Sequence, residues 1–300
     1  MQLPVQAQST YFVEQWEQEA GARELAAVAR ACDENGFDYV AVCDHVAIPR
    51  ANAPTMNTTW YDTVATLSWL AALTTKVRLL SHVYVPAYRH PLQTAKAFST
   101  LDALSDGRAI LGVGSGHVEA EFDLLGISFA DRGKITDTAV DTIRAAFADE
   151  WSAGDFGQRP RPIRPGGPPI WIGGSSNAAI RRAAERGDGW LPQGTLKKDM
   201  PAAIERLHEL RHAASRHGEF TVGAIAPFLY VGDPGWDTGK GCLAGDREKL
   251  AGYLRGYATM GVDQVQVRFR SRTCDELCDQ IRAFGADVAP LLDDHDDNEE

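Results

Sequence analysis

The chain has 300 residues, enough for one large domain or two ordinary ones, and its 44% hydrophobic and 24% charged content is close to the globular average. This composition excludes a mainly disordered chain, and no apolar run reaches the roughly 18 residues of a membrane-spanning helix. The net charge of −11 argues against a nucleic-acid-binding surface. Part of that charge is local, because residues 293–300 carry six acids. We therefore expect a single domain over residues 1–292 and an acidic, disordered tail over residues 293–300.

The five cysteines are odd in number and irregularly spaced, which does not fit a disulfide framework. Residues 1–4 lack the basic and long apolar regions of a secretory signal. Both features predict a reducing, cytoplasmic setting and no membrane association. Cys274 and Cys278 lie four residues apart with no second Cys or His pair nearby, so no metal site is expected.

Short, β-rich apolar runs alternate with amphipathic helical patterns along the chain. Strands are predicted at residues 3–7, 37–43, 77–85, 108–113, 169–172, 189–191, 220–231 and 262–269. Helices are predicted at residues 19–35, 62–73, 92–104, 117–125, 134–150, 176–186, 199–217, 246–260 and 274–286. Strict alternation predicts βαβ units and a parallel sheet.

Eight such units in this length favour an α/β fold of the closed (β/α)8 TIM-like barrel type over an open doubly wound sheet. The runs VAV, RLL, AIL, IWI and VQV are nearly continuous, as strands buried on both faces should be. Residues 154–169 are rich in proline, which favours an extended path. They are predicted to form an insertion between strands four and five.

Active sites of such barrels lie at the carboxyl ends of the strands. Strand two ends in Asp44-His45, strand three in Ser81-His82-Val83 and strand four in Gly114-Ser115-Gly116-His117. Histidine is the side chain best suited to proton transfer near neutral pH, so three histidines at successive strand ends indicate a catalytic role. The alternative for each is a strand cap or a locally satisfied hydrogen bond.

Strand five ends in Gly173-Gly174-Ser175-Ser176, just before a predicted helix. Backbone N–H groups at such a turn, together with the helix dipole, suit a phosphate. An ordinary βα turn with a serine N-cap is the other interpretation.

Three further patterns invite a functional interpretation. Gly112 to His117 fails the G-x-G-x-x-G dinucleotide motif, because its last position is a histidine. His208-Glu209-Leu210-Arg211-His212 matches H-E-x-x-H, but its helix lies on the outside of a barrel, so we regard the match as chance. Trp60, Tyr61, Tyr84 and Tyr88 gather near loops two and three, where they line either a substrate pocket or the core.

Several segments resemble the bacterial-luciferase-like flavin and deazaflavin oxidoreductases, in the branch that depends on coenzyme F420. The most specific stretch is residues 89–133, from Arg89-His90-Pro91 through Ser105-Asp106-Gly107-Arg108 and the strand-four glycines to Asp131-Arg132-Gly133. The resemblance extends on either side to Gly36-Phe37-Asp38, Asp44-His45 and Pro169-Ile170-Trp171-Ile172-Gly173-Gly174.

The resemblance implies a TIM-like barrel with a deazaflavin or flavin in its mouth. It assigns cofactor contacts to Asp44, His82, Val83, Ser115, Gly116, Gly173, Gly174 and Ser175, and it implies a non-prolyl cis peptide between His82 and Val83. Some F420 dehydrogenases carry a catalytic Glu just after the strand-four glycines, whereas this chain has His117 there. His45 is the first candidate for the acid or base, His117 is the second, and Trp60, Tyr84 and Tyr88 are expected to line the substrate pocket.

The function expected is an F420-dependent oxidoreductase that transfers a hydride between the deazaflavin and a small or medium organic substrate. The first alternative is an FMNH2-dependent two-component monooxygenase of the same fold, which needs a separate flavin reductase. The second is a barrel that holds a flavin without turnover. The family also implies a homodimer.

Overall fold

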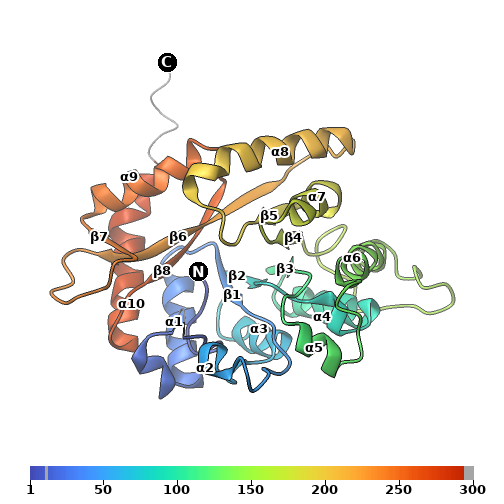
Figure 1. Cartoon of the computed structure of the whole chain (residues 1–300), viewed down its shortest axis with the longest axis horizontal. Helices are drawn as coiled ribbons and strands as arrows, with labels where there is room; N and C mark the ends of the chain where they lie inside the picture. The colour runs from blue at the N-terminus through green and yellow to red at the C-terminus, as the bar shows by residue number, and fades with distance from the viewer. Residues whose placement is uncertain (11–12, 294–300) are drawn as a thin grey trace.

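The computed structural model describes residues 1–10 and 13–293 of the chain (Figure 1). A parallel sheet runs in the order β1-β2-β3-β4-β5-β6-β7, and β8 pairs with β6. Helices alternate with the strands, so the predicted α/β class is confirmed. The strands are β1 (Tyr39–Val42), β2 (Arg78–Ser81), β3 (Ala109–Val113), β4 (Ile170–Gly173), β5 (Gly189–Leu191), β6 (Thr221–Val231), β7 (Cys242–Gly245) and β8 (Gln264–Phe269).

Each predicted helix is found, with its ends shifted by a few residues. The helices are α1 (Ala22–Glu34), α2 (Ala53–Met56), α3 (Thr63–Ala71), α4 (Pro91–Leu104), α5 (Glu119–Leu124), α6 (Arg132–Ala148), α7 (Asn177–Arg186), α8 (Met200–Ala213), α9 (Arg247–Ala258), α10 (Cys274–Ala283) and α11 (Pro290–Asp293). Several begin at side-chain caps, as at Asp62 before α3 and Ser176 before α7. No helix among the described residues is long and apolar enough to cross a membrane.

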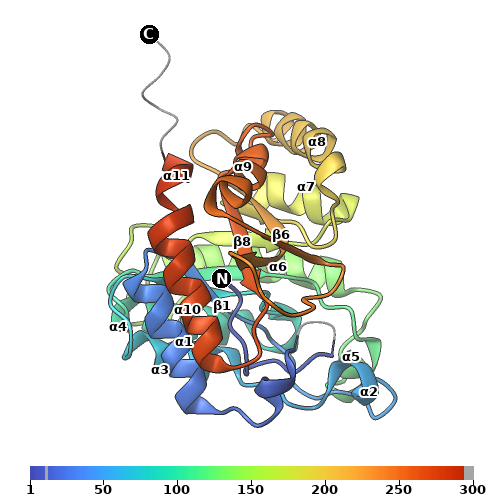
Figure 2. The same cartoon turned by 90° about the vertical axis from the view of Figure 1, so that its left-hand side faces the viewer.

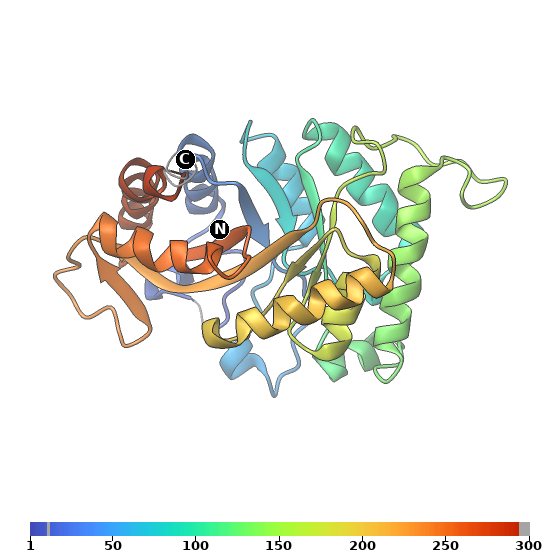
Figure 3. The same ribbon diagram turned by 90° about the horizontal axis from the view of Figure 1, so that it is seen from above.

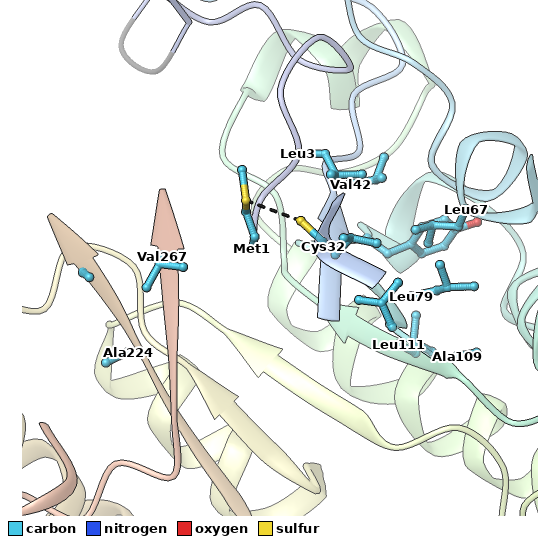
Figure 4. Close-up of a cluster of buried hydrophobic side chains, with 14 of the residues drawn as sticks. Met1, Leu3, Cys32, Val42, Leu67, Leu79, Ala109, Leu111, Ala224 and Val267 are labelled. Carbon is cyan, nitrogen blue, oxygen red and sulfur yellow. Dashed lines mark hydrogen bonds between the residues drawn. The ribbon is translucent and has the colours of Figure 1, made fainter. Parts of the chain in front are cut away.

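Side chains alternate between the two faces of the sheet, because successive strand residues point to opposite sides. One face carries a compact cluster of six buried side chains inside the curved sheet: Tyr39, Ala41, Leu80, Ile110, Trp171 and Leu191. Their neighbours in sequence, such as Val42, Leu79 and Leu111, join the larger cluster that packs against the helices (Figure 4). Burial on both faces explains the nearly continuous apolar runs.

The N-terminal segment departs from the prediction. Instead of a strand over residues 3–7, it makes two isolated bridges, a parallel one between Gln2 and Ala41 and an antiparallel one between Ala7 and Trp60. Pro4 lacks an N–H group, and Val5 has a φ of 68°, which no strand residue adopts. Met1 and Leu3 still extend the sheet beside β1, since the N–H of Leu3 donates to the Ala41 carbonyl.

Contacts between the two ends of the chain bring β8 close to this N-terminal segment. Trp16 Nε1 donates to Ser271 Oγ at 3.1 Å, and Arg270 pairs with Glu14 at 2.9 Å. Helices α1 and α10 pack side by side on the outside (Figure 2). Within the described residues, side chains and helices rather than a strand ladder make this junction.

The insertion predicted between strands four and five runs from the end of α6 to β4. It forms a long loop that projects from the body of the molecule (Figure 3). Strand β7 was not predicted, and it extends the sheet beside the second half of β6. Most of the predicted acidic tail, residues 294–300, lies outside the described residues.

Candidate functional site

The carboxyl ends of β1 to β4 bring together most of the residues singled out in the sequence. His45 follows β1, Val83 follows β2, His117 follows β3, and the glycine-serine turn follows β4. The rings of His45 and His117 lie 5.7 Å apart, centre to centre, although the residues are far apart in sequence. Trp60 completes this group, with its ring 4.3 Å from that of His45 in an edge-to-face arrangement.

His45 is bonded to a buried carboxylate. Its Nδ1 lies 2.7 Å from Oε2 of Glu121, whose side chain has 0% exposed surface. The Tyr88 hydroxyl donates to the same oxygen at 3.3 Å. The backbone N–H groups of Val46 and Ala47 donate to the other oxygen at 2.9 and 3.2 Å. Glu121 therefore holds both the imidazole and the loop that follows β1.

These bonds determine the charge of Glu121 and the tautomer of His45. Burial raises the pKa of Glu121, but the bonds from His45 and the two backbone N–H groups outweigh burial, and the pKa falls below its usual value of 4.5. An ionised carboxylate can only accept, so Nδ1 of His45 carries a hydrogen. In the neutral ring, Nε2 is then the free proton acceptor.

His117 stands beside this pair. Loss of hydration around its ring and the neighbouring His45 lower the pKa of His117, against the opposing attraction of Glu121. His117 is therefore neutral near pH 7. Its lowered pKa makes it a weaker base than an ordinary histidine.

Asp44, predicted to contact the cofactor, is engaged by the protein itself. Arg89 donates to its two oxygens from two nitrogens, each at 2.8 Å, in a bidentate pair. The backbone N–H of Val85 donates to Oδ2 at 2.9 Å. Asp44 is 4% exposed. Its hydrogen bonds to Val85 and Arg89 connect the loop after β1 to the segment after β2. A direct contact between Asp44 and a cofactor stays a prediction.

The peptide between His82 and Val83 is cis, as predicted. The Val83 side chain fits against two glycines at the ends of neighbouring strands. A Cβ added at Gly114 would lie 2.4 Å from Val83 Cγ2, and one added at Gly173 would lie 2.5 Å from Val83 Cγ1. Both positions therefore require glycine if Val83 is to keep this place.

The His82 side chain is 2% exposed, and neither ring nitrogen has a hydrogen-bond partner among the described residues. Burial, with the nearby Arg268 and the terminal amine, lowers the pKa of His82 to about 3. The ring is therefore neutral at physiological pH and shielded from solvent. Of the two residues joined by the cis bond, only Val83 is partly open to the surface.

The turn after β4 has the shape expected of an anion site, and we call residues 173–176 the cradle. Gly174 has a φ of +109°, which side-chain-bearing residues rarely adopt. The Ser176 side chain caps α7 by accepting from the N–H of Ala179 at 3.2 Å. Gly173, Gly174 and Ser175 are half-buried, so the cradle opens to the surface.

The remaining predicted residues divide between rim and core. Trp60 and Ser115 are half-buried at the rim, and Gly116 has a φ of +77° with Phe122 closely packed on it. Tyr84 is 2% exposed and packs edge to face on Phe98 in the core, so its place in the substrate pocket stays a prediction. Tyr88 is also buried, and its hydroxyl faces Glu121 rather than solvent.

Two residues important to this geometry were not predicted as site residues. Glu121 and Arg89 both lie within the stretch that carries the family resemblance, yet their roles depend on partners 76 and 45 positions away. The motif H-E-x-x-H proves irrelevant to the site, since His208 and His212 are exposed on α8. Across residues 1–10 and 13–293, no group of three or more His, Cys, Asp or Glu side chains is placed to hold a metal ion.

Sequence relatives include proteins with and without a known activity. An uncharacterised protein of Mycobacterium tuberculosis is 29% identical over 217 residues, which cover 66% of this chain and 75% of that protein. The 5,10-methylenetetrahydromethanopterin reductase of Methanolobus tindarius is 30% identical over 211 residues, 68% of this chain and 61% of the reductase.

Solved structures share the fold over nearly the whole chain. Monooxygenase RslO1 from Streptomyces bottropensis has a TM-score of 0.76 at 20% identity, covering 96% of this chain and 98% of that one. The coenzyme F420-dependent tetrahydromethanopterin reductase of Methanopyrus kandleri has a TM-score of 0.69 at 22% identity, covering 91% and 96%. The oxygenating constituent of the Pseudomonas putida 3,6-diketocamphane monooxygenase, in complex with FMN, has a TM-score of 0.72 at 13% identity, covering 91% and 94%.

The sequence profile of the luciferase-like monooxygenases matches residues 4–235, well over half of the chain. The match includes β1 to β6 and all of the strand ends described above. The chain therefore belongs to the luciferase-like monooxygenase family, as its resemblance predicted.

Proposed function

We propose that this protein is an F420-dependent oxidoreductase that transfers a hydride between the deazaflavin and a small or medium organic substrate. The observation that carries the proposal is the His45–Glu121 pair, 2.7 Å apart, at the same strand ends as Val83 and the cradle. Such a pair supports the proposal because it would serve as a proton donor or acceptor of fixed tautomer at the carboxyl ends of the strands. The relatives named as methylenetetrahydromethanopterin reductases, and the F420-dependent structural neighbour, support the choice of cofactor.

The residues present fit a ring-bearing, phosphorylated cofactor. A Cβ at Gly114 or Gly173 would displace Val83. Because both residues are glycine, the Val83 side chain keeps its place, where it would pack against a cofactor ring. The cradle, with the α7 N-terminus behind it, suits a phosphate group. Val83, Gly173 and Gly174 would hold the cofactor, with Ser115 and Gly116 beside them.

The bound deazaflavin would supply hydride chemistry, and the protein would orient the reactants and manage the proton. His45 acts as the acid or base, because Nε2 of its neutral ring accepts a proton while Glu121 stabilises the imidazolium that results. Glu121 is a positioning residue, since it acts through His45. Trp60 covers one side of His45 and limits its access to water.

FMN is the second candidate, favoured by the FMN-bound neighbour of the same fold. In that case the protein would act as a two-component monooxygenase, supplied with reduced FMN by a separate reductase. A barrel that holds a flavin without turnover is the third. We also propose a cytoplasmic homodimer acting on a small molecule, without nucleic-acid or membrane partners.

One experiment separates these functions. Purified protein is titrated with F420, with FMN and with reduced FMN, and binding is followed by absorbance and fluorescence. We expect F420 to bind at least about tenfold more tightly than either form of FMN. Tighter binding of reduced FMN, with oxygen consumption on addition of substrate, would replace our proposal with the monooxygenase. Binding of neither cofactor would refute both.

A further inference from the structure

The loop between β5 and α8, residues 192–199, is attached to the rest of the molecule at two separate points. One point is Ser175 in the cradle, and the other is a pair of tyrosines on α9. We call these residues the β5–α8 loop. It lies at the carboxyl end of β5, beside the strand that carries the cradle.

At the first point, two hydroxyl groups and a carbonyl form a chain. Ser175 Oγ lies 2.6 Å from the carbonyl oxygen of Gln193, and Thr195 Oγ1 lies 2.7 Å from Ser175 Oγ. A carbonyl can only accept, so the single hydrogen of the Ser175 hydroxyl points to Gln193. Thr195 must then donate to Ser175. The directions of both bonds follow from this one constraint.

In this series of hydrogen bonds, the only hydrogen of the Ser175 hydroxyl is donated to Gln193, so none is left to donate to a phosphate. Its remaining electron pairs would repel an anionic oxygen rather than bind it. With the β5–α8 loop in this position, the donors of the cradle are the backbone N–H groups of Ser175 and Ser176 and those at the start of α7, because the N–H of Gly174 donates to the Leu191 carbonyl at 3.0 Å. The resemblance had assigned Ser175 to the cofactor, whereas its side chain here serves the loop.

At the second point, Lys197 is enclosed by aromatic rings. Its Nζ lies 4.0 Å from the centre of the Tyr253 ring and 4.4 Å from that of Tyr257, and it donates to the Tyr253 carbonyl at 2.8 Å. A Cβ at Gly256 would come within 2.8 Å of the same Nζ. Burial lowers the pKa of Lys197. Glycine at position 256 thus leaves room for the ammonium group against α9.

We propose that Ser175, Thr195 and Lys197 are positioning residues that hold the β5–α8 loop in place as the side wall of the cradle. In this arrangement the Ser175 hydroxyl belongs to the loop attachment and is not a ligand of the cofactor phosphate. The effect on cofactor affinity rests on the proposed function, but the attachment of the loop does not.

The test uses the full-length protein and three variants: Ser175→Ala, Thr195→Val and their combination. Amide hydrogen exchange of residues 193–198 is measured without cofactor, and dissociation constants are measured for F420 and FMN. We expect exchange to rise at least about fivefold in each single variant, and more in Ser175→Ala, since Thr195→Val loses one hydrogen bond of ordinary strength and Ser175→Ala loses two. Cofactor affinity should fall about three- to tenfold in both, and the combined variant should resemble Ser175→Ala.

A matched pair of lysine variants tests the second attachment. Lys197→Met keeps much of the aliphatic stem and removes the charge, whereas Lys198→Met alters the exposed neighbour. Faster exchange at residues 196–199 is expected in Lys197→Met and not in Lys198→Met. Equal exchange in the two variants would refute the role of Lys197.

The outcomes separate this inference from the proposed function. If Thr195→Val leaves exchange and affinity unchanged while Ser175→Ala weakens cofactor binding, Ser175 is a direct ligand and the inference fails. If neither F420 nor FMN binds the unaltered protein, the proposed function fails, and exchange alone decides whether the attachment exists. Unchanged amide exchange in both Ser175→Ala and Thr195→Val would refute the proposed attachment of the β5–α8 loop.

Discussion

The two ends of the parallel sheet use charged side chains in different ways. At the amino end, Arg108 precedes β3 and donates to the carbonyls of Ala71, Thr74 and Val77, each within 3.0 Å. Asp33, at the same end, accepts from the N–H groups that lead into β2. These partners are backbone groups that do not titrate. Their effect is to fix where strands and helices begin and end.

At the carboxyl end, charged groups bond to other titratable side chains. Glu121 accepts from His45 and Tyr88, and Asp44 accepts from Arg89. A change of protonation in one member therefore alters its partner. Ion pairs also occur at the amino end, but those of Asp38 and Asp188 with arginines are partly exposed, whereas Asp44 and Glu121 are buried. The comparison indicates that the proposed chemistry depends on buried carboxylates whose partners are other charged or titratable side chains. This agrees with the general division of barrels into a catalytic end and a stabilising end.

Replacing His45 tests the catalytic end most severely. His45→Asn should lower turnover by about 10²–10⁴-fold, the usual contribution of a general acid or base. Single-turnover kinetics with saturating cofactor measures the effect, and cofactor affinity should change little. Normal turnover with weak cofactor binding would make His45 a cofactor ligand instead.

Replacing Arg108 tests the stabilising end. Arg108→Ala leaves several carbonyls without donors and should lower the free energy of unfolding by about 3 kcal/mol. Denaturant unfolding measures this loss. Turnover per folded molecule should stay normal, and a large loss of turnover in fully folded protein would contradict the division between the two ends.

Glu121→Gln keeps the shape of the side chain and removes its charge. Turnover should fall about 10- to 100-fold, the usual effect of removing a group that orients a functional histidine. Cofactor affinity should change little, because Glu121 acts through His45 and not on the cofactor. Unchanged turnover in Glu121→Gln would refute the positioning role of Glu121.

The smallest expected effect is on the pH dependence of stability. The pKa of His82 is about 3 in the folded chain and near 6.5 when unfolded, so the unfolded chain alone binds a proton between these values. Stability is fully present above pH 6.5 and falls as pH decreases towards 3. His82→Gln should lose this dependence in urea unfolding curves compared between pH 7.5 and 5.

Glu17 serves as an internal check on that comparison. Burial raises the pKa of Glu17 to about 7, so its contribution to stability has the opposite sign and is lost as pH rises. The unaltered protein and the His82→Gln variant both contain Glu17. The difference between their plots of stability against pH is therefore due to His82. Identical curves would show that His82 becomes solvated in the native state.

Strand and helix periodicity was enough to predict the fold, because burial on both faces leaves a simple apolar signal in β1 to β4. It failed at the two ends of the sheet. The N-terminal segment makes only isolated bridges, to Ala41 and to Trp60, among the described residues, and β7 is four half-buried residues without alternation. Both segments owe their pairing to a neighbouring strand and not to their own pattern.

The candidate site could be predicted only in part. The strand pattern placed His45, Val83 and the cradle at the carboxyl ends of β1, β2 and β4, where the structure has them. It could not predict that Glu121 binds His45 or that Arg89 pairs with Asp44, since both contacts join segments that are distant in sequence. For Tyr84 the sequence left a pocket and the core as alternatives, and the contact with Phe98 on α4 could not be read from the sequence because it joins two separate segments.

The junction between β8 and the N-terminal segment has a consequence for how the chain folds. Trp16 and Ser271 are 255 positions apart, and Glu14 and Arg270 are 256 apart. Contacts of such separation have the highest entropic cost of loop closure, and they form slowly. The part of α1 that packs on α10 therefore stays uncovered until α10 has been made. On the ribosome this surface is exposed for almost the whole synthesis of the chain.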